Sequence, residues 1–559
     1  MIQKDELVHF FLMPIIIGSI GGASAIIFRA MIRFFSSTFN FIDIFHSNYF
    51  YLFTMPILFY ISNLLISKFL IDHSNVTIDD VAKRVALYRG HFSYTRGILV
   101  LLLSSIGIGF GAPVGREGPI AKLGGVGTEF FLKMLHIQRE NMPIYLSAGI
   151  SAAISATFNA PIAGVIFGLE IIIGKINSYI VIPLIVASTT ATVISDHFIG
   201  DFTAFYVPRI DYSDKYFLFV PILSILFAFA SVVLLNSLRK LNKIRIHFGN
   251  KWKYISILIG FLVGLVIVAV PQTKGVGYDY VTQIFVSGFD SDISLEIFLA
   301  KLAIVALSIG SGIFGGLMSP SIFIGAFGGY WAGQTMIHWG ANPQAFALIG
   351  SAAMLAGISR APLRAAIIIT ELTHSYQLLP AMFMASAITG YVLSKFEPGS
   401  YFKRCLIRKG IDIENDNVDR FFENLDIKNY VEDIPPVRSY TEIKRLKRLF
   451  RHFKVQHFPV VDNQHKLIGM VSMRDLRRRY MAGKRKKRAL EIMSQNAFAI
   501  SDNYIPEDIY KAISTIDSNY IPYISDSGKY LGMVNLNKLI KTISLIEQHY
   551  EIGDRPKNL

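Results

Sequence analysis

Long apolar stretches recur over roughly the first four hundred residues of the chain, and short polar turns separate them. Several are about 20 residues long, the length that an α-helix needs to cross a bilayer core of about 30 Å. Others are shorter and interrupted by glycine and proline, which is typical of broken or re-entrant helices. We therefore predict an all-α polytopic membrane domain built from the apolar stretches 9–35, 51–71, 94–112, 142–158, 162–174, 180–198, 215–236, 253–271, 296–308, 343–357 and 378–395.

The composition agrees with a membrane protein. The chain is 52% hydrophobic and 17% charged, with a mean hydropathy of +0.43, far from the balance of soluble domains. Much of the net charge of +15 lies after residue 400, including the basic runs 477–479 and 484–488. The positive-inside rule predicts that this region is cytoplasmic. A solvated cytoplasmic face explains these runs, so no nucleic-acid partner is expected.

Two segments with the same motif indicate an internal repeat. GREGPIAKLGGVG starts at Gly115 and GLMSPSIFIGAFG at Gly316, an offset of 316 − 115 = 201 positions. A second pair, Ala160-Pro161 and Ala361-Pro362, has the same offset. We predict two related halves, about 9–200 and 214–400, within a membrane domain 1–405. Repeats of this kind in transporters commonly have inverted topology, with the solute site at their interface.

The composition changes after the membrane domain. A linker rich in Asp, Asn and Glu, 406–430, leads to two similar units that contain HFPVVDNQHKLIGMVSMRDL and YIPYISDSGKYLGMVNLNKLI. Each unit has the pattern of strand, turn, strand and helix. This pattern resembles a tandem pair of CBS domains, a cytosolic α+β module. We place the first copy at 431–485, the second at 486–545, and a tail at 546–559.

The GREGP segment places a carboxylate within an apolar region. A helix start leaves backbone N–H groups unpaired and carries a partial positive charge. Glycines allow an anion to approach the backbone, and proline suits the first helical turn. Since the second half has an equivalent segment, two helix starts are expected to face one anion site. Glu117 would either gate that site, or cap its helix or pair with Arg116.

GREGP resembles the signature of the CLC family of chloride channels and chloride/proton exchangers, and the resemblance extends over 9–405. It implies a homodimer in the cell (inner) membrane with one pore per subunit, carrying chloride or another small anion and, in exchangers, protons. It also implies that Glu117 is the gating glutamate. The anion would contact residues of both halves, Gly115, Arg116, Gly118, Leu317, Met318 and Tyr401. Tyr401 could instead belong to an interfacial aromatic belt.

Two departures from the family pattern bear on selectivity and coupling. The first anion motif of the family is reduced here to Ser74 within HSNVT, which lacks both glycines and the proline. Ser74 remains the candidate ligand, and chloride preference stays open. Proton-coupled members usually carry a second glutamate where this chain has Ile171. The chain therefore leans towards a channel or a weakly coupled pathway, with a chloride/proton antiporter as the alternative.

Two further acidic residues, Glu170 and Glu371, occupy equivalent places in the halves. We interpret both as structural residues that pair with a helix start or with a nearby arginine.

CBS pairs commonly bind adenine nucleotides through a Gly-x-x-Ser/Thr-x-x-Asp pattern. The first copy keeps it, with Ser472 and Asp475, whereas the second has Asn535 and Lys538 at the matching positions. The first copy is either an adenine-nucleotide site or a structural element that supports a dimer. No cofactor is required, and no metal site is expected.

Two other classes of protein fit the sequence less well. A cation transporter with CBS domains, for instance for magnesium, needs convergent carboxylates and carbonyls. The repeated segments provide glycines, helix starts and basic residues instead. An intramembrane enzyme is not expected, since the sequence has no HExxH, GxSxG, P-loop or Cys/His metal pattern.

Overall fold

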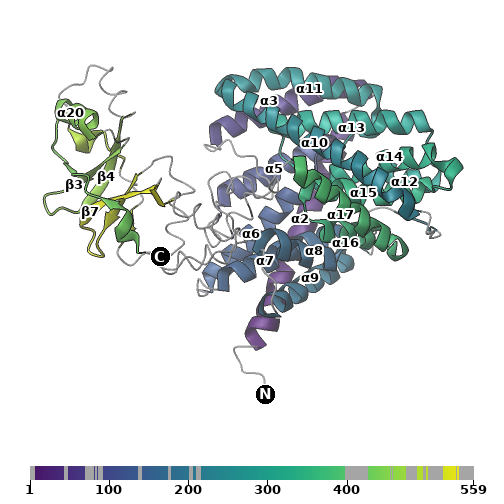
Figure 1. Cartoon of the computed structure of the whole chain (residues 1–559), viewed down its shortest axis with the longest axis horizontal. Helices are drawn as coiled ribbons and strands as arrows, with labels where there is room; N and C mark the ends of the chain where they lie inside the picture. The colour runs from purple at the N-terminus through teal and green to yellow at the C-terminus, as the bar shows by residue number, and fades with distance from the viewer. Residues whose placement is uncertain are drawn as a thin grey trace. The chain divides into compact units, whose positions relative to one another are not determined.

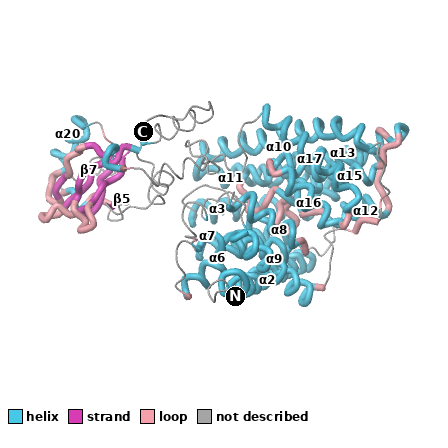
Figure 2. Tube along the Cα trace, turned by 60° about the horizontal axis from the view of Figure 1, so that its bottom comes forward, coloured by secondary structure: helices cyan, strands magenta, loops and turns pink. Residues whose placement is uncertain are grey.

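The computed structural model describes residues 7–42, 48–69, 81, 85, 92, 94–135, 141–173, 178–200, 206–208, 210, 216–396, 426–453, 455, 457–473, 488–494, 499–501, 520–536 and 538–539. The chain forms two compact units, Met1–Lys403 and Arg404–Leu559. Described helices fill the first unit, whereas the described strands longer than a single bridge belong to the second (Figures 1 and 2).

The described part of the membrane unit is built from two successive groups of helices. The first group comprises the π-helix η1 (Val8–Leu12), α2 (Met13–Ile42), η2 (Asn48–Phe50), α3 (Tyr51–Phe69), α5 (Tyr94–Gly109), α6 (Glu117–Met134), α7 (Met142–Phe158), α8 (Pro161–Phe167), η4 (Gly168–Ile173) and α9 (Ser178–Ile199). The second comprises α10 (Tyr216–Phe248), η5 (Gly249–Lys251), α11 (Trp252–Ala269), η6 (Pro271–Thr273), α12 (Tyr278–Val286), α13 (Ser291–Ser311), α14 (Met318–Thr335), η7 (Ile337–Trp339), α15 (Pro343–Ser359), α16 (Pro362–Thr373), η8 (Tyr376–Leu378) and α17 (Leu379–Phe396).

The helix bounds confirm the internal repeat. Adding 201 to both ends of α7 gives both ends of α15, and adding it to the first residues of α6 and α8 gives the first residues of α14 and α16. The breaks between helices also correspond, because Asn159 (φ 54°) and Arg360 (φ 53°) are both left-handed residues ahead of an Ala-Pro pair. The inverted sense of the repeat stays a prediction.

Among the described residues, seven helices are long and apolar enough to cross a membrane. Other apolar helices are shorter, such as the 17-residue helices α7 and α15, which at 1.5 Å per residue are about 25 Å long. Nearly every residue of α7 and α15 is buried, so these helices are interior elements of the unit. They pack against α6 and α14, the two helices that begin at the repeated motifs. The predicted broken helices are thus confirmed at these places.

The described part of the second unit combines short helices with two small sheets. Its elements are η9 (Ile427–Tyr430), β1 (Val431–Glu432), β2 (Val437–Arg438), α20 (Ile443–Phe453), β3 (His457–Val461), β4 (Leu467–Ser472), η10 (Ala489–Glu491), β5 (Ile500–Ser501), β6 (Tyr520–Ile524) and β7 (Tyr530–Asn535). The sheets have the orders β2-β3-β4 and β1-β7-β6-β5. The two predicted strand–turn–strand units are confirmed as the hairpins β3–β4 and β6–β7. The helices expected after them lie largely outside the described residues.

The two CBS copies within this unit contribute strands to one sheet. Strand β1 precedes the first hairpin in the chain but pairs antiparallel with β7 of the second hairpin, with Val431 opposite Val534. The hairpin turns also bond to each other, because the N–H of Leu467 donates to the carbonyl of Gly528 (3.1 Å) and that of Tyr530 to His465 (3.0 Å). The copies therefore fold as one body rather than as two independent domains.

Candidate anion site

The loops that lead into α6 and α14 are bonded to each other. The N–H of Gly115 donates to the carbonyl of Gly316 (2.8 Å), and the N–H of Gly316 donates back to Gly115 (2.6 Å). These two glycines occupy equivalent positions of the repeat. The reciprocal pair of bonds therefore brings two equivalent helix starts to one place, as the repeated motif predicts.

Glu117 is the first residue of α6 and its side chain is fully buried. Its Oε1 accepts a hydrogen bond from the backbone N–H of Ser319 (2.8 Å) and another from the Ser319 hydroxyl. Ser319 is the second residue of α14, so its N–H has no acceptor within that helix. The carboxylate of the first half thus lies at the positive helix end of the second half, a place suited to an anion.

The glycines beside this carboxylate provide its space. A Cβ atom built on either Gly115 or Gly316 would collide with Oε2 of Glu117. Any larger residue at these two positions would require the carboxylate to move. The glycines of the motif therefore permit both the reciprocal backbone pair and the buried position of the acid.

Arg116 and Glu117 both belong to the part of the chain that the structure describes, and they form no ion pair. The alternative interpretation of the motif, a pair of Glu117 with Arg116, is therefore wrong. The guanidinium of Arg116 lies over aromatic rings, 4.9 Å from the centroid of Phe158 and 5.7 Å from that of Tyr278. Cation–π contacts of this kind stabilise a positive charge away from water. Arg116 adds positive potential near the site without neutralising the carboxylate by direct contact.

Tyr278 is a site residue that sequence reasoning missed. It begins α12 after Gly277 (φ 81°), and its side chain interacts with Arg116, Glu117 and Ser319. The segment YDYVTQIFV is short and carries no anion motif, so its proximity to the site depends on tertiary packing. Ser319 was missed as well, although it is a polar residue at a predicted helix start.

A buried lysine holds the segment that precedes Tyr278. Lys301 of α13 is fully buried, and its ammonium donates to the carbonyls of Thr273 (2.7 Å) and Gly275 (2.6 Å). It also lies 4.4 Å from the ring centroid of Phe323 in α14. Gly275 in turn donates to the carbonyl of Gly111, in the loop that leads to the site (2.8 Å). Lys301 is therefore a positioning residue for both sides of the site.

The structure places the other predicted site residues as follows. Gly118 is buried in the first turn of α6, and Leu317 and Met318 are buried at the start of α14. Ser472 ends strand β4. Ser74, Tyr401 and Asp475 lie outside the described residues, as does the side chain of Ile171.

Glu371 stabilises a helix of the other half, in agreement with its structural interpretation. Its carboxylate accepts hydrogen bonds from the N–H groups of Ile162 (2.9 Å) and Ala163 (2.6 Å) in the first turn of α8. Its counterpart Glu170 lies in η4, where it interacts with the buried guanidinium of Arg364. Within the described ranges, no cluster of three His, Cys, Asp or Glu side chains could hold a metal ion.

Comparison with known proteins identifies the family of this fold and site. The chain belongs to the voltage gated chloride channel family, whose model matches residues 58–395. A CBS domain model matches residues 427–482. The expected class of chloride channels and transporters with a C-terminal CBS region is thereby confirmed.

Individual relatives agree with this family. A putative chloride channel protein ClcB-like from Ralstonia nicotianae is 28% identical over 344 residues, covering 60% of this chain and 80% of the relative. The voltage-gated ClC-type chloride channel ClcB of Citrobacter koseri is 26% identical over 328 residues, covering 56% and 77%.

Solved structures share the fold at lower identity. A slow cyanobacterial Cl⁻/H⁺ antiporter superposes with a TM-score of 0.64 at 19% identity, covering 73% of this chain and 99% of that one. A eukaryotic CLC transporter gives 0.62 at 18% identity and covers 95% and 98%. A CLC-type fluoride/proton antiporter gives 0.58 at 19% identity, with 71% and 98% covered.

Proposed function

We propose that the chain transports chloride through a pathway that Glu117 opens and closes. The observation that supports this most directly is the bond from the Ser319 N–H to the Glu117 carboxylate. An anion can occupy the start of α14 only after that carboxylate has left it. The proposed role is thus transport, and no enzymatic activity is proposed.

Protonation provides one way to release the gate. An ionised Glu117 competes with chloride for the N–H and hydroxyl of Ser319, because both acceptors are anions. A protonated Glu117 has lost that charge, and its hold on the helix start weakens. The backbone donors and the glycine-lined space then remain for chloride, which is bound by dipoles and can leave again.

A channel or weakly proton-coupled pathway is the form of transport that we favour. Ile171 supports it, since an aliphatic side chain cannot relay a proton at the position where coupled members of the family usually have glutamate. A chloride/proton antiporter is the second candidate, because two of the solved structures with this fold are named antiporters.

The reversal potential of the reconstituted protein distinguishes the two. The purified chain is placed in vesicles at fixed chloride, and a pH gradient is imposed across the membrane. The reversal potential of a channel stays at the equilibrium potential of chloride, whereas that of an antiporter shifts with the pH gradient. The same measurement on Glu117→Ala tests the gate: flux should become independent of pH. Unchanged pH dependence of flux in Glu117→Ala would contradict a gating role.

We further propose an adenine-nucleotide site at the first CBS copy, with Ser472 and Asp475 as ligands. Asp475 would accept hydrogen bonds from ribose hydroxyls. Calorimetric titration of the full chain with ATP and with AMP tests this. Binding should be lost in Asp475→Ala and kept in Asp526→Ala, an exposed aspartate of the second hairpin turn. If the wild-type chain takes up no nucleotide, the CBS pair has a structural role.

The assembly and orientation that we propose are a homodimer in the inner membrane, with one pore per subunit and the CBS region in the cytoplasm. Basic runs after residue 400 support this orientation. Protease added to sealed right-side-out vesicles should leave the C-terminal unit intact and cut it only after permeabilisation. The mass of the detergent-solubilised complex tests the dimer.

A further inference from the structure

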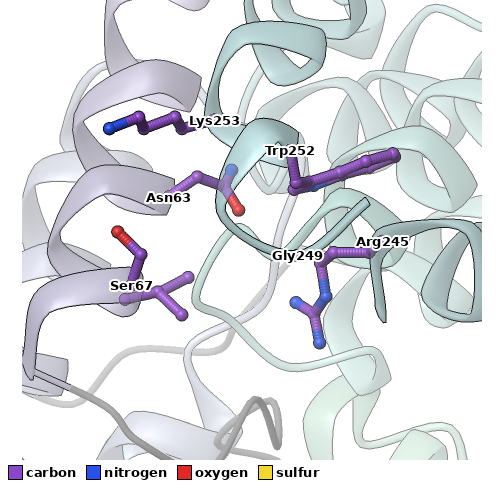
Figure 3. Close-up of a pocket in the computed structure, with 7 residues that line it drawn as sticks. Asn63, Ser67, Arg245, Gly249, Trp252 and Lys253 are labelled. Carbon is purple, nitrogen blue, oxygen red and sulfur yellow. The ribbon is translucent and has the colours of Figure 1, made fainter. Parts of the chain in front are cut away.

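A small pocket whose lining includes charged and polar side chains lies at the ends of three candidate membrane spans (Figure 3). The pocket is open to solvent, and its volume of about 20 Å³ holds about one water molecule, so a larger ligand would bind across its mouth. Asn63, Ile66 and Ser67 come from the end of α3. The other four lining residues surround the turn from α10 to α11. The seven lining residues include two cations and no acid, and they are Asn63, Ile66, Ser67, Arg245, Gly249, Trp252 and Lys253.

The pocket belongs to a strongly basic part of the chain. The segment RKLNKIRIHFGNKWK, which runs from Arg239 to Lys253, contains six Lys or Arg residues and no acidic residue. Helix α10 has 33 residues, which corresponds to about 50 Å, whereas a bilayer with its headgroups is about 40–45 Å thick. The basic end of α10 therefore reaches the headgroup region when the apolar part of the helix spans the core.

Arg245 is built into the pocket rather than displayed on the surface. Its side chain is only 5% exposed, and its Nη2 donates to the Asn242 side chain (2.8 Å). Its Nη1 lies against Gly312, where an added Cβ would approach it to 2.5 Å. Next to it the indole N–H of Trp252 donates to the carbonyl of Ser311 (2.9 Å). These bonds hold the guanidinium and the indole in fixed positions at the end of α13.

The surroundings of the pocket suit a lipid. Tyr254 and Leu258 of α11 are 60% and 61% exposed, although they belong to a candidate membrane span. They offer an apolar surface for acyl chains beside a cationic pocket for a headgroup. Basic pockets between membrane helices are a recognised setting for acidic lipid headgroups. A free phosphate would use the cations and leave this apolar surface without a role.

We propose that this pocket binds the phosphate of an anionic phospholipid. Lys253 and Arg245 supply the positive charge, the Ser67 hydroxyl supplies a further donor, and Trp252 forms one wall at the interface. Since Arg245 and Trp252 also contact Gly312 and Ser311, a bound lipid stabilises the start of the loop that leads to α14. The pocket would thus link membrane composition to the segment that carries the anion site.

Tryptophan quenching in vesicles tests the proposal with the full chain. The chain has three tryptophans, so Trp331→Phe with Trp339→Phe leaves Trp252 as the reporter. Brominated phosphatidylglycerol in a phosphatidylcholine background should quench it at a lower lipid fraction than brominated phosphatidylcholine does. Lys253→Gln should raise the half-quenching fraction about fivefold, the effect expected for one lysine near an anionic surface.

Lys395→Gln is the matched control, since Lys395 is an exposed lysine at the end of another candidate span. It should leave the half-quenching fraction unchanged. Equal quenching by the two brominated lipids, or equal effects of the two lysine variants, would overturn the proposal. Relief of quenching by millimolar glycerol phosphate would assign the pocket to a soluble phosphate instead. If Lys253→Gln does not fold, Ser67→Ala provides the comparison and should weaken quenching in the same direction.

Discussion

The carboxylate of Glu117 accepts a hydrogen bond of 2.8 Å from the N–H of Ser319, a residue 202 positions away in the other half of the membrane unit. The acid and the helix start that binds it thus come from different halves. Neither half alone contains the complete gate. Changes to either partner should therefore alter the same property, the balance between bound carboxylate and bound chloride.

Ser319→Ala removes the hydroxyl donor and leaves the backbone N–H in place. A hydrogen bond to a charged group contributes about 1.5–3 kcal/mol, so the carboxylate should leave the helix start more readily. We expect chloride flux at neutral pH to increase by at least about tenfold, since about 1.4 kcal/mol corresponds to a factor of ten. The measurement is efflux from chloride-loaded vesicles. Ser321→Ala is the control, because Ser321 donates within α14 to the carbonyl of Leu317; equal effects of both variants would contradict the prediction.

Gly316→Ala tests whether the glycines provide the space for the gate. The new Cβ would occupy the position of Oε2 of Glu117, so the carboxylate should be expelled and flux should lose its pH dependence. In a Glu117→Ala background the same substitution should add little, because the clashing atoms are gone. Gly390→Ala, where an added Cβ meets nothing within 4 Å, is the neutral comparison. Equal losses in both backgrounds would show that Gly316 acts independently of Glu117.

Glu371→Ala should destabilise the membrane unit without changing ion selectivity. It leaves two N–H groups at the start of α8 without their acceptor, at a cost of about 2–3 kcal/mol. Glu371→Gln keeps an acceptor oxygen and should lie between the wild type and Glu371→Ala. Thermal melting in detergent checks this order. A shifted reversal potential in a variant of normal stability would mean that Glu371 takes part in transport.

Tyr530→Phe should loosen the contact between the two CBS copies. The buried Tyr530 hydroxyl donates to the carbonyl of Ile434 (2.6 Å). The variant removes this donor from the carbonyl, which costs about 1–3 kcal/mol of stability. Amide hydrogen exchange of the full chain should show reduced protection in β7. Tyr440→Phe serves as the control, because Tyr440 is half-exposed. Equal exchange in the two variants would contradict a role for the buried bond.

Because of the same tyrosine, we expect the C-terminal unit to lose stability in alkali. Burial, with a further contribution from the charge of Asp433, raises the pKa of Tyr530 above its ordinary value of 10.0. Because the pKa is raised in the folded state, the protonated Tyr530 hydroxyl contributes its full share to the stability of the C-terminal unit below about pH 10. That contribution is lost as the pH rises further. Limited proteolysis of the full chain between pH 8 and 11 should therefore show increasing cleavage of the C-terminal unit above about pH 10. That increase should be smaller in Tyr530→Phe.

Much of the membrane fold could be predicted because its signals are local. Apolar length and interruptions by proline identify the spans and the breaks, and the fixed offset between GREGP and GLMSP identifies the repeat. Helix α12 was missed, since YDYVTQIFV is short and mixes polar with apolar residues. The contact of Tyr278 with the site depends on how that helix packs, which no local pattern records.

The site itself was predicted in its elements but not in its pairing. Glycines, proline and glutamate at a helix start indicate an anion site, and the structure brings those helix starts together. That Glu117 would bond to Ser319 of the other half could not be read from either motif alone. Likewise, β-branched and aromatic residues on both sides of a polar turn predict the hairpins β3–β4 and β6–β7, but the two-residue strand β1 gives no sign that it pairs with β7.

The reciprocal bonds between Gly115 and Gly316 bear on how the duplicated halves evolved. The two glycines are equivalent residues of a duplicated sequence, and each donates to the other. Before the duplicated halves were fused, the same pair would have joined one glycine to its own copy in a second polypeptide. Such a self-complementary contact is what a two-fold symmetric dimer requires. The ancestral transporter would then have been an assembly of half-length chains, with its ion site on the symmetry axis. A fused chain can carry different residues in its two halves, as Glu117 and Met318 do here.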